Sequence, residues 1–314
     1  MTAYIVRRLL LMIPVLLLVA VTIFFLLHMS PGDPVAVLLG PDATTEQVEQ
    51  VREALGLNEP LPLQLLHWFQ GLLHGDLGTS IFLNKPVTEA ILERAEPTIL
   101  LTIGASLVAI LIGVPLGVLS AVRRGSLLDT GSMLVAMLGI SMPTFWIGLN
   151  LILIFAVTLR WLPAQGYQSI SEAGVATLKY LLLPSITLGA AQAALLARMT
   201  RSMMLEVLSE DYIRTARAKG VLERRVVFRH ALHNAFIPLV TVIGLTFAVL
   251  MGGAVITEQV FNIPGVGRLL VQAVLRRDFP LVQGIVLTIA FLYVVINLLV
   301  DVLYVFLDPR IRYS

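Results

Sequence analysis

Six long stretches of apolar residues dominate the pattern along this chain. None of them contains Asp, Glu, Lys or Arg, and they are Leu9–His28, Thr98–Val122, Gly131–Leu159, Tyr180–Ala197, Ala235–Thr257 and Phe279–Val300. A helix needs about 20 predominantly apolar residues to cross the hydrocarbon of a bilayer. Because its backbone must also satisfy its own hydrogen bonds there, the pattern predicts an all-α membrane protein with about six transmembrane helices.

The composition supports this class. Of the 314 residues, 57% are hydrophobic and only 13% are charged, whereas a soluble domain carries about 25% charged residues. The chain has no cysteine, which excludes disulfides and thiolate metal sites. Its isoelectric point near 9.0 comes with a net charge of only +2. This mild basicity requires no nucleic-acid partner, since cytoplasmic membrane loops are rich in Lys and Arg.

Arg7 and Arg8 precede the first apolar stretch, an arrangement that also occurs in secretory signal peptides. The run Leu9–Leu27 is, however, longer than the roughly 7–15 residues of a signal-peptide core, and no small-x-small cleavage site follows it. We therefore expect an uncleaved first helix, so that residues 1–29 form an N-terminal tail and the first span.

The distribution of basic residues indicates the orientation, because Lys and Arg accumulate in cytoplasmic loops. With the N-terminus in the cytoplasm, the segments on that side hold Arg7, Arg8, Arg123, Arg124, eight basic residues from Arg198 to Arg229, Arg310 and Arg312. The segments on the opposite side hold fewer. This distribution predicts a multi-pass protein with both termini in the cytoplasm.

Residues 30–97 between the first two stretches are too many for a bare connection. Thr44 and Gln47 have the spacing of a capping box, and Gly56 supplies a C-terminal stop. Apolar residues recur at helical spacing in two pieces, at Val48, Val51 and Leu55 and at Leu63, Leu66, Phe69, Leu72 and Leu73. We predict a helical periplasmic insertion, which either only packs on the pore domain or also contacts a delivery protein.

Residues 98–314 are predicted to form the core transmembrane domain, with a cytoplasmic loop at residues 198–234. Five prolines lie in the apolar stretches, and proline kinks a helix: Pro14, Pro115, Pro143, Pro184 and Pro238. Gly113 and Gly117 have the small-xxx-small spacing that permits close contact between helices.

The loop at 198–234 contains a short segment with helix signals at both ends. Asp211 can cap its start, and Gly220 can close it in the left-handed conformation. Tyr212, Ile213 and Ala216 form a modest apolar face. Near its C-terminal half, cations that complement the helix dipole are Arg214, Arg217 and Lys219. The sequence predicts a short, rigid, basic helix from Asp211 to Lys219 that projects into the cytoplasm.

This segment resembles the coupling-helix motif of ABC importer permeases, written Glu-Ala-Ala, three residues, Gly, nine residues, Ile-x-Leu-Pro. Ala216, Gly220 and Leu232 match it. The departures, which weaken the match to the general motif, are Arg214 for Glu, Thr215 for Ala, His230 for Ile and His233 for Pro. The run Asp-Tyr-Ile-Arg-Thr-Ala-Arg-Ala-Lys-Gly, followed by Arg-His-Ala-Leu-His-Asn-Ala-Phe-Ile-Pro, is close to the form found in di- and oligopeptide importers.

Other segments along nearly the whole chain resemble the first permease subunit of dipeptide, oligopeptide and glutathione importers. They are Pro31–Pro34, Gly75–Ser80, Gly139–Trp146, Leu183–Gly189, Phe261–Arg268 and Asp301–Tyr313. The resemblance implies the type I ABC importer permease fold in a bacterial inner membrane. Nickel and opine importers share the pattern, so import of such small molecules stays open as an alternative to peptides.

The resemblance also implies partners. These are a second homologous permease in a heterodimer, two cytoplasmic ATP-binding subunits, a periplasmic or lipid-anchored substrate-binding protein, and membrane lipid. In the family, the coupling helix docks into a groove of an ATPase, and in this chain that helix comprises Asp211, Tyr212, Ile213, Arg214, Thr215, Ala216, Arg217, Ala218, Lys219 and Gly220.

Sequence motifs of catalysis are absent. No Gly-x-x-x-x-Gly-Lys-Ser/Thr loop occurs, so we expect a non-enzymatic subunit without its own cofactor, whose partners bind ATP and Mg²⁺. No His-Glu-x-x-His occurs either, and His230 and His233 are better explained by structural roles than by a metal site. The main rival class, an ion-coupled secondary transporter, is disfavoured because no charged residue lies centrally in an apolar stretch.

Overall fold

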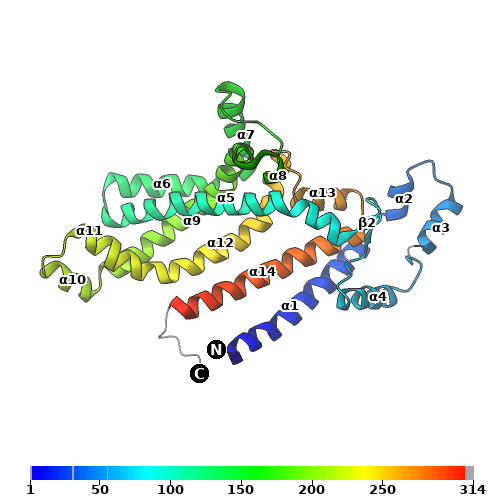
Figure 1. Ribbon diagram of the computed structural model, residues 1–314, viewed down its shortest axis with the longest axis horizontal. Helices are drawn as coiled ribbons and strands as arrows, with labels where there is room; N and C mark the ends of the chain where they lie inside the picture. Colours follow the sequence, from blue (N-terminus) through cyan, green and yellow to red (C-terminus); the bar gives the residue numbers. More distant parts are fainter. Residues whose placement is uncertain (1, 30–31, 55, 308–314) are drawn as a thin grey trace. The chain divides into compact units, whose positions relative to one another are not determined.

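The computed structural model describes residues 2–29, 32–54 and 56–307, and within them the backbone is almost entirely helical (Figure 1). The chain divides into two compact units, Met1–Glu96 with Pro264–Val294 and Pro97–Ile263 with Val295–Ser314. Two long helices, α5 (Val87–Val122) and α14 (Phe279–Leu307), begin in the first unit and end in the second. The predicted all-α class is confirmed. Sequence predictions that fall outside the described residues concern Pro31, Leu55, Arg310, Arg312 and the segment Asp308–Tyr313.

The first unit gathers short helices around the ends of longer ones. Besides the start of α5 and of α14, its elements are α1 (Thr2–Met29), α2 (Pro34–Leu39), α3 (Thr45–Ala54), α4 (Leu61–Leu73), β1 (Thr79–Ser80), β2 (Lys85–Pro86) and α13 (Val266–Leu275). The two strands pair antiparallel, with Thr79 opposite Pro86. Its core joins Leu27, Val87, Leu269 and Ile285, one from each of α1, α5, α13 and α14.

The predicted helices after the first span are present. The N–H of Thr44 donates to Gln47 Oε1 at 3.0 Å, and the N–H of Gln47 donates to Thr44 Oγ1 at 3.3 Å, so the predicted capping box forms at the start of α3. Gly56 follows with φ +68°, in the left-handed region that favours glycine. The second amphipathic piece is α4.

Asp278 ties the strand hairpin to the start of α14. This buried carboxylate accepts hydrogen bonds from Ser80 Oγ at 2.5 Å and from the N–H groups of Ile81 and Phe82 at 3.3 and 3.1 Å. It also accepts from the N–H of Leu281 in the first turn of α14, at 3.3 Å. One side chain therefore caps a helix and anchors a turn nearly 200 residues away in sequence.

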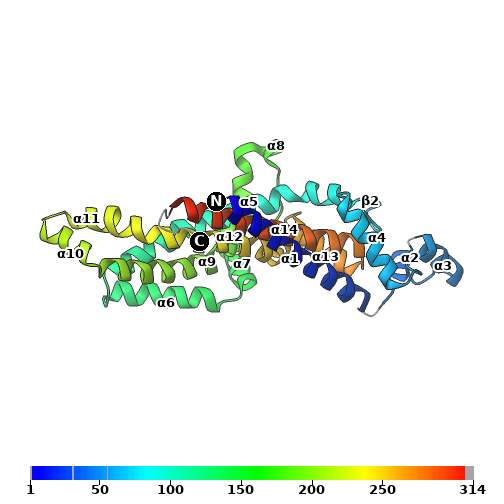
Figure 2. The same cartoon turned by 90° about the horizontal axis from the view of Figure 1, so that it is seen from below.

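The second unit is a bundle built around one long helix. Its elements, besides the later parts of α5 and α14, are α6 (Leu127–Ser141), α7 (Thr144–Leu151), η1 (Ile152–Thr158), α8 (Ile170–Ala173), η2 (Gly174–Ala176), α9 (Thr177–Leu208), α10 (Asp211–Ala218), α11 (Glu223–Arg225), η3 (Val226–Leu232) and α12 (His233–Val260). Helix α9 packs against α6, α7 and α12. Figures 1 and 2 both show α9 and α12 side by side, with α10 and α11 at one end of the pair.

Helices α5 and α9 approach closely at the predicted glycines. A Cβ added at Gly113 would lie 2.5 Å from the carbonyl oxygen of Ala193, and one at Gly117 would lie 2.5 Å from that of Ala197. From the other side, a Cβ at Gly189 would lie 2.6 Å from the carbonyl oxygen of Ala105. The small-xxx-small spacing thus marks a true helix contact, because only residues without a side chain let the two backbones come so near.

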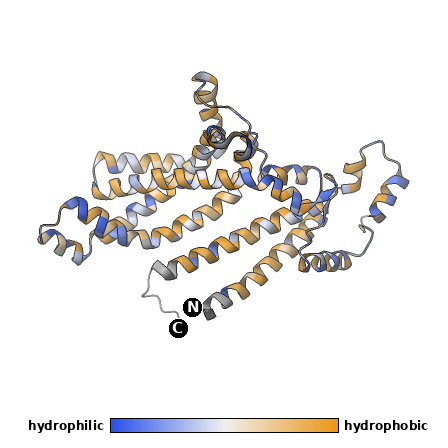
Figure 3. Cartoon of the chain, in the orientation of Figure 1, coloured by the Kyte–Doolittle hydropathy of each residue, from blue (hydrophilic) through white to orange (hydrophobic). Residues whose placement is uncertain are grey.

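Five helices in the described part of the chain are long and apolar enough to cross a membrane: Arg8–Met29, Val87–Val122, Ile170–Leu208, Pro238–Val260 and Phe279–Leu303. A pair of bent helices, Leu127–Ser141 with Thr144–Thr158, gives a sixth crossing if it counts as one span. Figure 3 shows apolar residues along α1, α12 and α14, and hydrophilic residues gathered on α3, α10 and α11. The prediction of about six transmembrane helices is confirmed.

The third predicted span is not one continuous helix. The stretch Gly131–Leu159 is bent by 103° between Ser141 and Thr144. Met142 is extended (φ −81°, ψ 133°) because it precedes Pro143, whose ring disfavours the helical conformation of the residue before it. The other four prolines lie inside continuous helices. Hydropathy alone does not distinguish a proline at which a helix breaks from a proline inside a continuous helix.

Candidate functional site: the α9–α12 connection

The residues predicted to form the coupling helix lie in the connection between α9 and α12, residues 209–232. The structure contains the expected helix as α10, Asp211–Ala218, which ends one residue before the predicted limit. Asp211 was expected to cap it, but the cap position is taken by Glu210 (φ −66°, ψ 147°), which makes no side-chain capping bond. Asp211 instead lies in the first turn, where its negative charge complements the helix dipole, and pairs with Arg214 at 3.2 Å.

The end of α10 has the closure predicted from Gly220. This residue has φ +76°. Its N–H donates to Arg217 O at 2.9 Å, and the N–H of Val221 donates to Ala216 O at 3.2 Å. These two bonds form a Schellman motif, in which a left-handed residue satisfies the last carbonyls of the helix. Lys219 is the C-terminal cap residue. The helix therefore stops sharply and the chain turns back toward the bundle.

One face of α10 is embedded in the core of the second unit. Ile213 is fully buried and packs in a cluster with Met204 of α9, Val118 of α5 and Val226 of η3. Ala216 is partly buried against the same cluster. Helix α10 therefore shares one close-packed core with α5, α9 and η3.

Tyr212 was expected on the apolar face with Ile213 and Ala216, and this detail is wrong. Its side chain is 42% exposed, and its hydroxyl oxygen accepts a hydrogen bond from Asn234 Nδ2 at 2.7 Å. Asn234 also donates to the carbonyl of His230 at 3.0 Å. The phenol thus links α10 to the first turn of α12. An amphipathic side chain such as Tyr buries its ring edge while its polar tip finds a partner.

The basic residues of α10 differ in their surroundings. Arg217 donates from Nη2 and Nε to the two carboxylate oxygens of Glu223 in α11, at 2.7 and 3.1 Å. These hydrogen bonds raise the pKa of Arg217 and lower the pKa of Glu223. The Arg214 side chain is 72% exposed, and Lys219 is exposed. Arg214 and Lys219 therefore lie on the exposed surface, while Arg217 binds α10 to α11, where the chain turns back toward the bundle.

A second polar cluster lies beside the same core. Arg201 of α9 donates to both carboxylate oxygens of Asp129 in α6, at 2.7 and 2.8 Å. Asp129 is buried and also accepts from Ser120 Oγ of α5 and from the N–H of Gly125, the latter at 2.9 Å. Three helices thus meet at one carboxylate. From the sequence alone, Arg201 counted only among the basic residues that indicate orientation, and Asp129 was not predicted as a functional residue.

A local signal for Asp129 was nevertheless present. Ser126 stands three residues before it, and Ser126 Oγ accepts from the N–H of Asp129 at 3.3 Å as the N-cap of α6. This spacing marks a helix start, but its partner Arg201 is 72 residues away. Among the described residues, no group of three or more His, Asp or Glu side chains could hold a metal ion.

Family models match both halves of the chain. "Binding-protein-dependent transport system inner membrane component" matches residues 113–313, and "Binding-prot-dependent transport system membrane comp, N-term" matches residues 1–102. The first match includes the whole α9–α12 connection.

Similar curated proteins match over their full length. A probable peptide ABC transporter permease of Sinorhizobium fredii is 49% identical over 313 residues, 100% of both chains. A glutathione transport system permease of Salmonella typhimurium is 47% identical over 314 residues, again 100% of both. Among solved structures, the inward-facing MetNI methionine ABC transporter aligns with a TM-score of 0.58 and 20% identity, covering 70% of this chain and 96% of that one. This likeness bears on the fold alone, and it confirms the expected permease architecture.

Proposed function

We propose that this chain, which belongs to the family of binding-protein-dependent transport system inner membrane components, forms half of the translocation pore of an ABC importer that takes up peptides. Full-length relatives named for peptide and glutathione transport support the substrate class, a di- or oligopeptide or a glutathione-like compound. The structural observation that carries the proposal is the construction of α10: one buried face anchors it in the bundle, and exposed charges cover the other.

The other subunits of the transporter would be separate chains. We assign to the assembly a second homologous permease, two cytoplasmic ATP-binding subunits with their ATP and Mg²⁺, and an external binding protein that delivers the substrate. The chain contains no phosphate-binding loop of its own. In this assignment it is a non-catalytic subunit of the bacterial inner membrane, with both termini in the cytoplasm.

Coupling then follows from contacts within the second unit. The exposed side of α10, with Arg214 and Lys219, docks on an ATPase, and movement of the ATPase displaces the helix. Ile213 transmits the displacement to Met204 of α9 and Val118 of α5, which share its core. Because α5 and α9 are in backbone contact at Gly113 and Gly117, the two helices move together. The bundle then moves as a rigid group and opens the pore to one side of the membrane or the other.

The docking role can be tested by single-cysteine cross-linking, since the natural chain has no cysteine to interfere. Arg214→Cys, on the exposed side of α10, should cross-link to an ATPase subunit in membranes that contain the assembled transporter. Leu73→Cys, which replaces an exposed residue at the end of α4 in the first unit, is the control and should not.

The same variants report the orientation. A membrane-impermeant thiol reagent added to intact cells should label Leu73→Cys and leave Arg214→Cys unlabelled. Labelling of Arg214→Cys from outside, or its failure to reach any ATP-binding subunit, would refute the proposal. Uptake of labelled dipeptides and glutathione by the complete transporter then identifies the substrate.

A further inference from the structure

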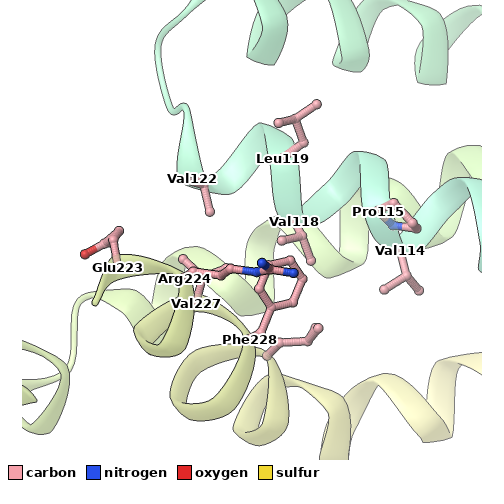
Figure 4. Close-up of a pocket in the computed structure, with 10 residues that line it drawn as sticks. Val114, Pro115, Val118, Leu119, Val122, Glu223, Arg224, Val227 and Phe228 are labelled. Carbon is pink, nitrogen blue, oxygen red and sulfur yellow. The ribbon is translucent and has the colours of Figure 1, made fainter. Parts of the chain in front are cut away.

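Two pockets open side by side where α5 ends against α11 and η3, and they share Arg224 and Phe228 as lining residues. The larger has a volume of about 550 Å³. Apolar side chains form most of its lining, together with Glu223 and Arg224. Figure 4 shows Val114, Val118 and Val122 extending from α5 toward the side on which Phe228 lies. The smaller has a volume of about 390 Å³, and besides Phe228 it is lined by Arg224, Arg225 and Arg229.

The three arginines of the smaller pocket form a cluster of positive charge. Within the part of the chain that the structure describes, none of them takes part in an ion pair. Glu223, the acid next to them in sequence, is held by both of its oxygens on Arg217. All three arginines are exposed. A cluster of like charges repels itself, so this surface favours an anionic ligand that neutralises it.

Several side chains of the apolar pocket beside them are also exposed. Leu119, Val122 and Phe228 are 39%, 43% and 56% exposed although they line a concave surface. Pro115 also lines this pocket from α5, and the wall formed by Val227 and Phe228 is the π-helical segment η3. A cleft of this size with apolar walls holds a hydrocarbon chain well, since the removal of apolar surface from water is favourable.

We propose that these adjoining pockets bind one anionic phospholipid, with an acyl chain in the apolar pocket and the phosphate on Arg224, Arg225 and Arg229. The combination of an apolar cleft and an adjoining basic surface matches a molecule that joins hydrocarbon to a negative headgroup. An acidic protein surface would neutralise the arginines but leave the apolar cleft unfilled. An apolar helix of another subunit would fill the cleft but leave the charge of the three arginines without an anion to neutralise it.

The location gives the lipid a mechanical role. Phe228 and Arg229 belong to η3, which follows α10 directly and shares its core through Val226. The facing wall is α5, which packs on α9. A lipid seated between α5 and η3 therefore stabilises one arrangement of the segment that carries α10. This inference does not depend on the substrate or on the docking of an ATPase.

The test uses the intact transporter, extracted with its native lipids and analysed by native mass spectrometry for bound phosphatidylglycerol. The variant Arg224→Gln/Arg225→Gln/Arg229→Gln should lower the affinity for this lipid by about a hundredfold, because each basic residue contributes about 1 kcal/mol to binding an anionic lipid. Binding of phosphatidylcholine should be weak in both proteins. The control Arg124→Gln/Arg160→Gln/Arg198→Gln removes the same charge from exposed positions outside both pockets and should retain the lipid.

A second variant tests the acyl-chain pocket with the arginines intact. Leu119→Trp places a larger ring in the cleft and should lower phosphatidylglycerol binding at least tenfold, with the subunit stoichiometry unchanged. Full retention of the lipid by either the arginine variant or Leu119→Trp overturns the proposal. Loss of another subunit from the arginine variant, with its lipid retained, would assign the surface to a protein interface and overturn it as well.

Discussion

Arg201 of α9 donates two parallel hydrogen bonds to Asp129 of α6, from Nε to Oδ1 at 2.7 Å and from Nη2 to Oδ2 at 2.8 Å. This paired geometry is the strongest that a guanidinium and a carboxylate can adopt. Because α9 runs on through Leu208 to α10, the ion pair fixes the part of α9 that leads into α10. It joins α6 to α9 at a point where Ser120 of α5 also donates to the same carboxylate.

Removal of one partner of this ion pair should be more damaging than removal of both. Arg201→Gln leaves the buried carboxylate of Asp129 without its counter-charge, which is strongly destabilising. We expect the apparent melting temperature of the transporter in detergent to fall by roughly 5 °C or more. The double variant Asp129→Asn/Arg201→Gln should recover part of the loss. Arg198→Gln, an exposed arginine one turn earlier on α9, is the matched control and should be neutral within error.

Gly117→Ala should destabilise the bundle although alanine is the better helix former. The new Cβ would lie 2.5 Å from Ala197 O and from Thr200 Cβ, and such overpacking costs about 1–3 kcal/mol. Gly131→Ala on α6 is the comparison, because a Cβ there meets nothing within 4 Å. It should be neutral or stabilising by about 0.5–1 kcal/mol. Thermal unfolding of both proteins measures the difference, and equal effects would contradict the close α5–α9 contact.

Gly220→Ala should weaken coupling rather than folding. Its φ of +76° costs a residue with a Cβ about 1–2 kcal/mol, which loosens the Schellman closure of α10. We expect a several-fold fall in substrate transported per ATP hydrolysed, measured in proteoliposomes. Gly166→Ala provides a matched control: it carries a similar backbone penalty (φ +99°) with no neighbour within 4 Å, and it lies far from α10 in the sequence. An unchanged transport ratio in Gly220→Ala would argue against α10 as the coupling element.

The Arg217–Glu223 pair gives the α10 region a defined pH response. Hydrogen bonding to Arg217 lowers the pKa of Glu223 below its ordinary value. The stabilisation is therefore complete above the pKa of the unfolded chain and is lost as the pH falls through the lowered pKa of the folded protein. The mobility of a spin label at Arg214→Cys should stay constant from neutral pH down past the ordinary Glu range and rise only below it.

The substitution Glu223→Gln supplies the control for this pH response. The amide cannot form the charged pair, so the label should be more mobile at neutral pH and its mobility should no longer change with pH in the acidic range. If the wild-type label became mobile near the ordinary pKa of a glutamate, Glu223 would not be the group that holds α10.

Local signals in the sequence were sufficient for several features of the candidate site. The Thr44–Gln47 capping box, the left-handed Gly220 and the Gly113–Gly117 contact were all predicted from spacing, because each depends on residues within one or two helical turns. The predicted helix over Asp211–Lys219 was correct within one residue for the same reason. Its cap was misassigned, since Glu210 and Asp211 are both acidic and adjacent, and only the backbone shows which one lies outside the helix.

The sequence by itself determined the class of the protein and the approximate positions of its membrane helices, because crossing hydrocarbon demands a long apolar run and that demand is local. Only the tertiary structure decided that Ile213 rather than Tyr212 anchors α10, and that Asp129 meets Arg201. It alone brought α5 beside η3 to form the two pockets. Each of these depends on which distant residue comes into contact, and no pattern within a single stretch of chain carries that information.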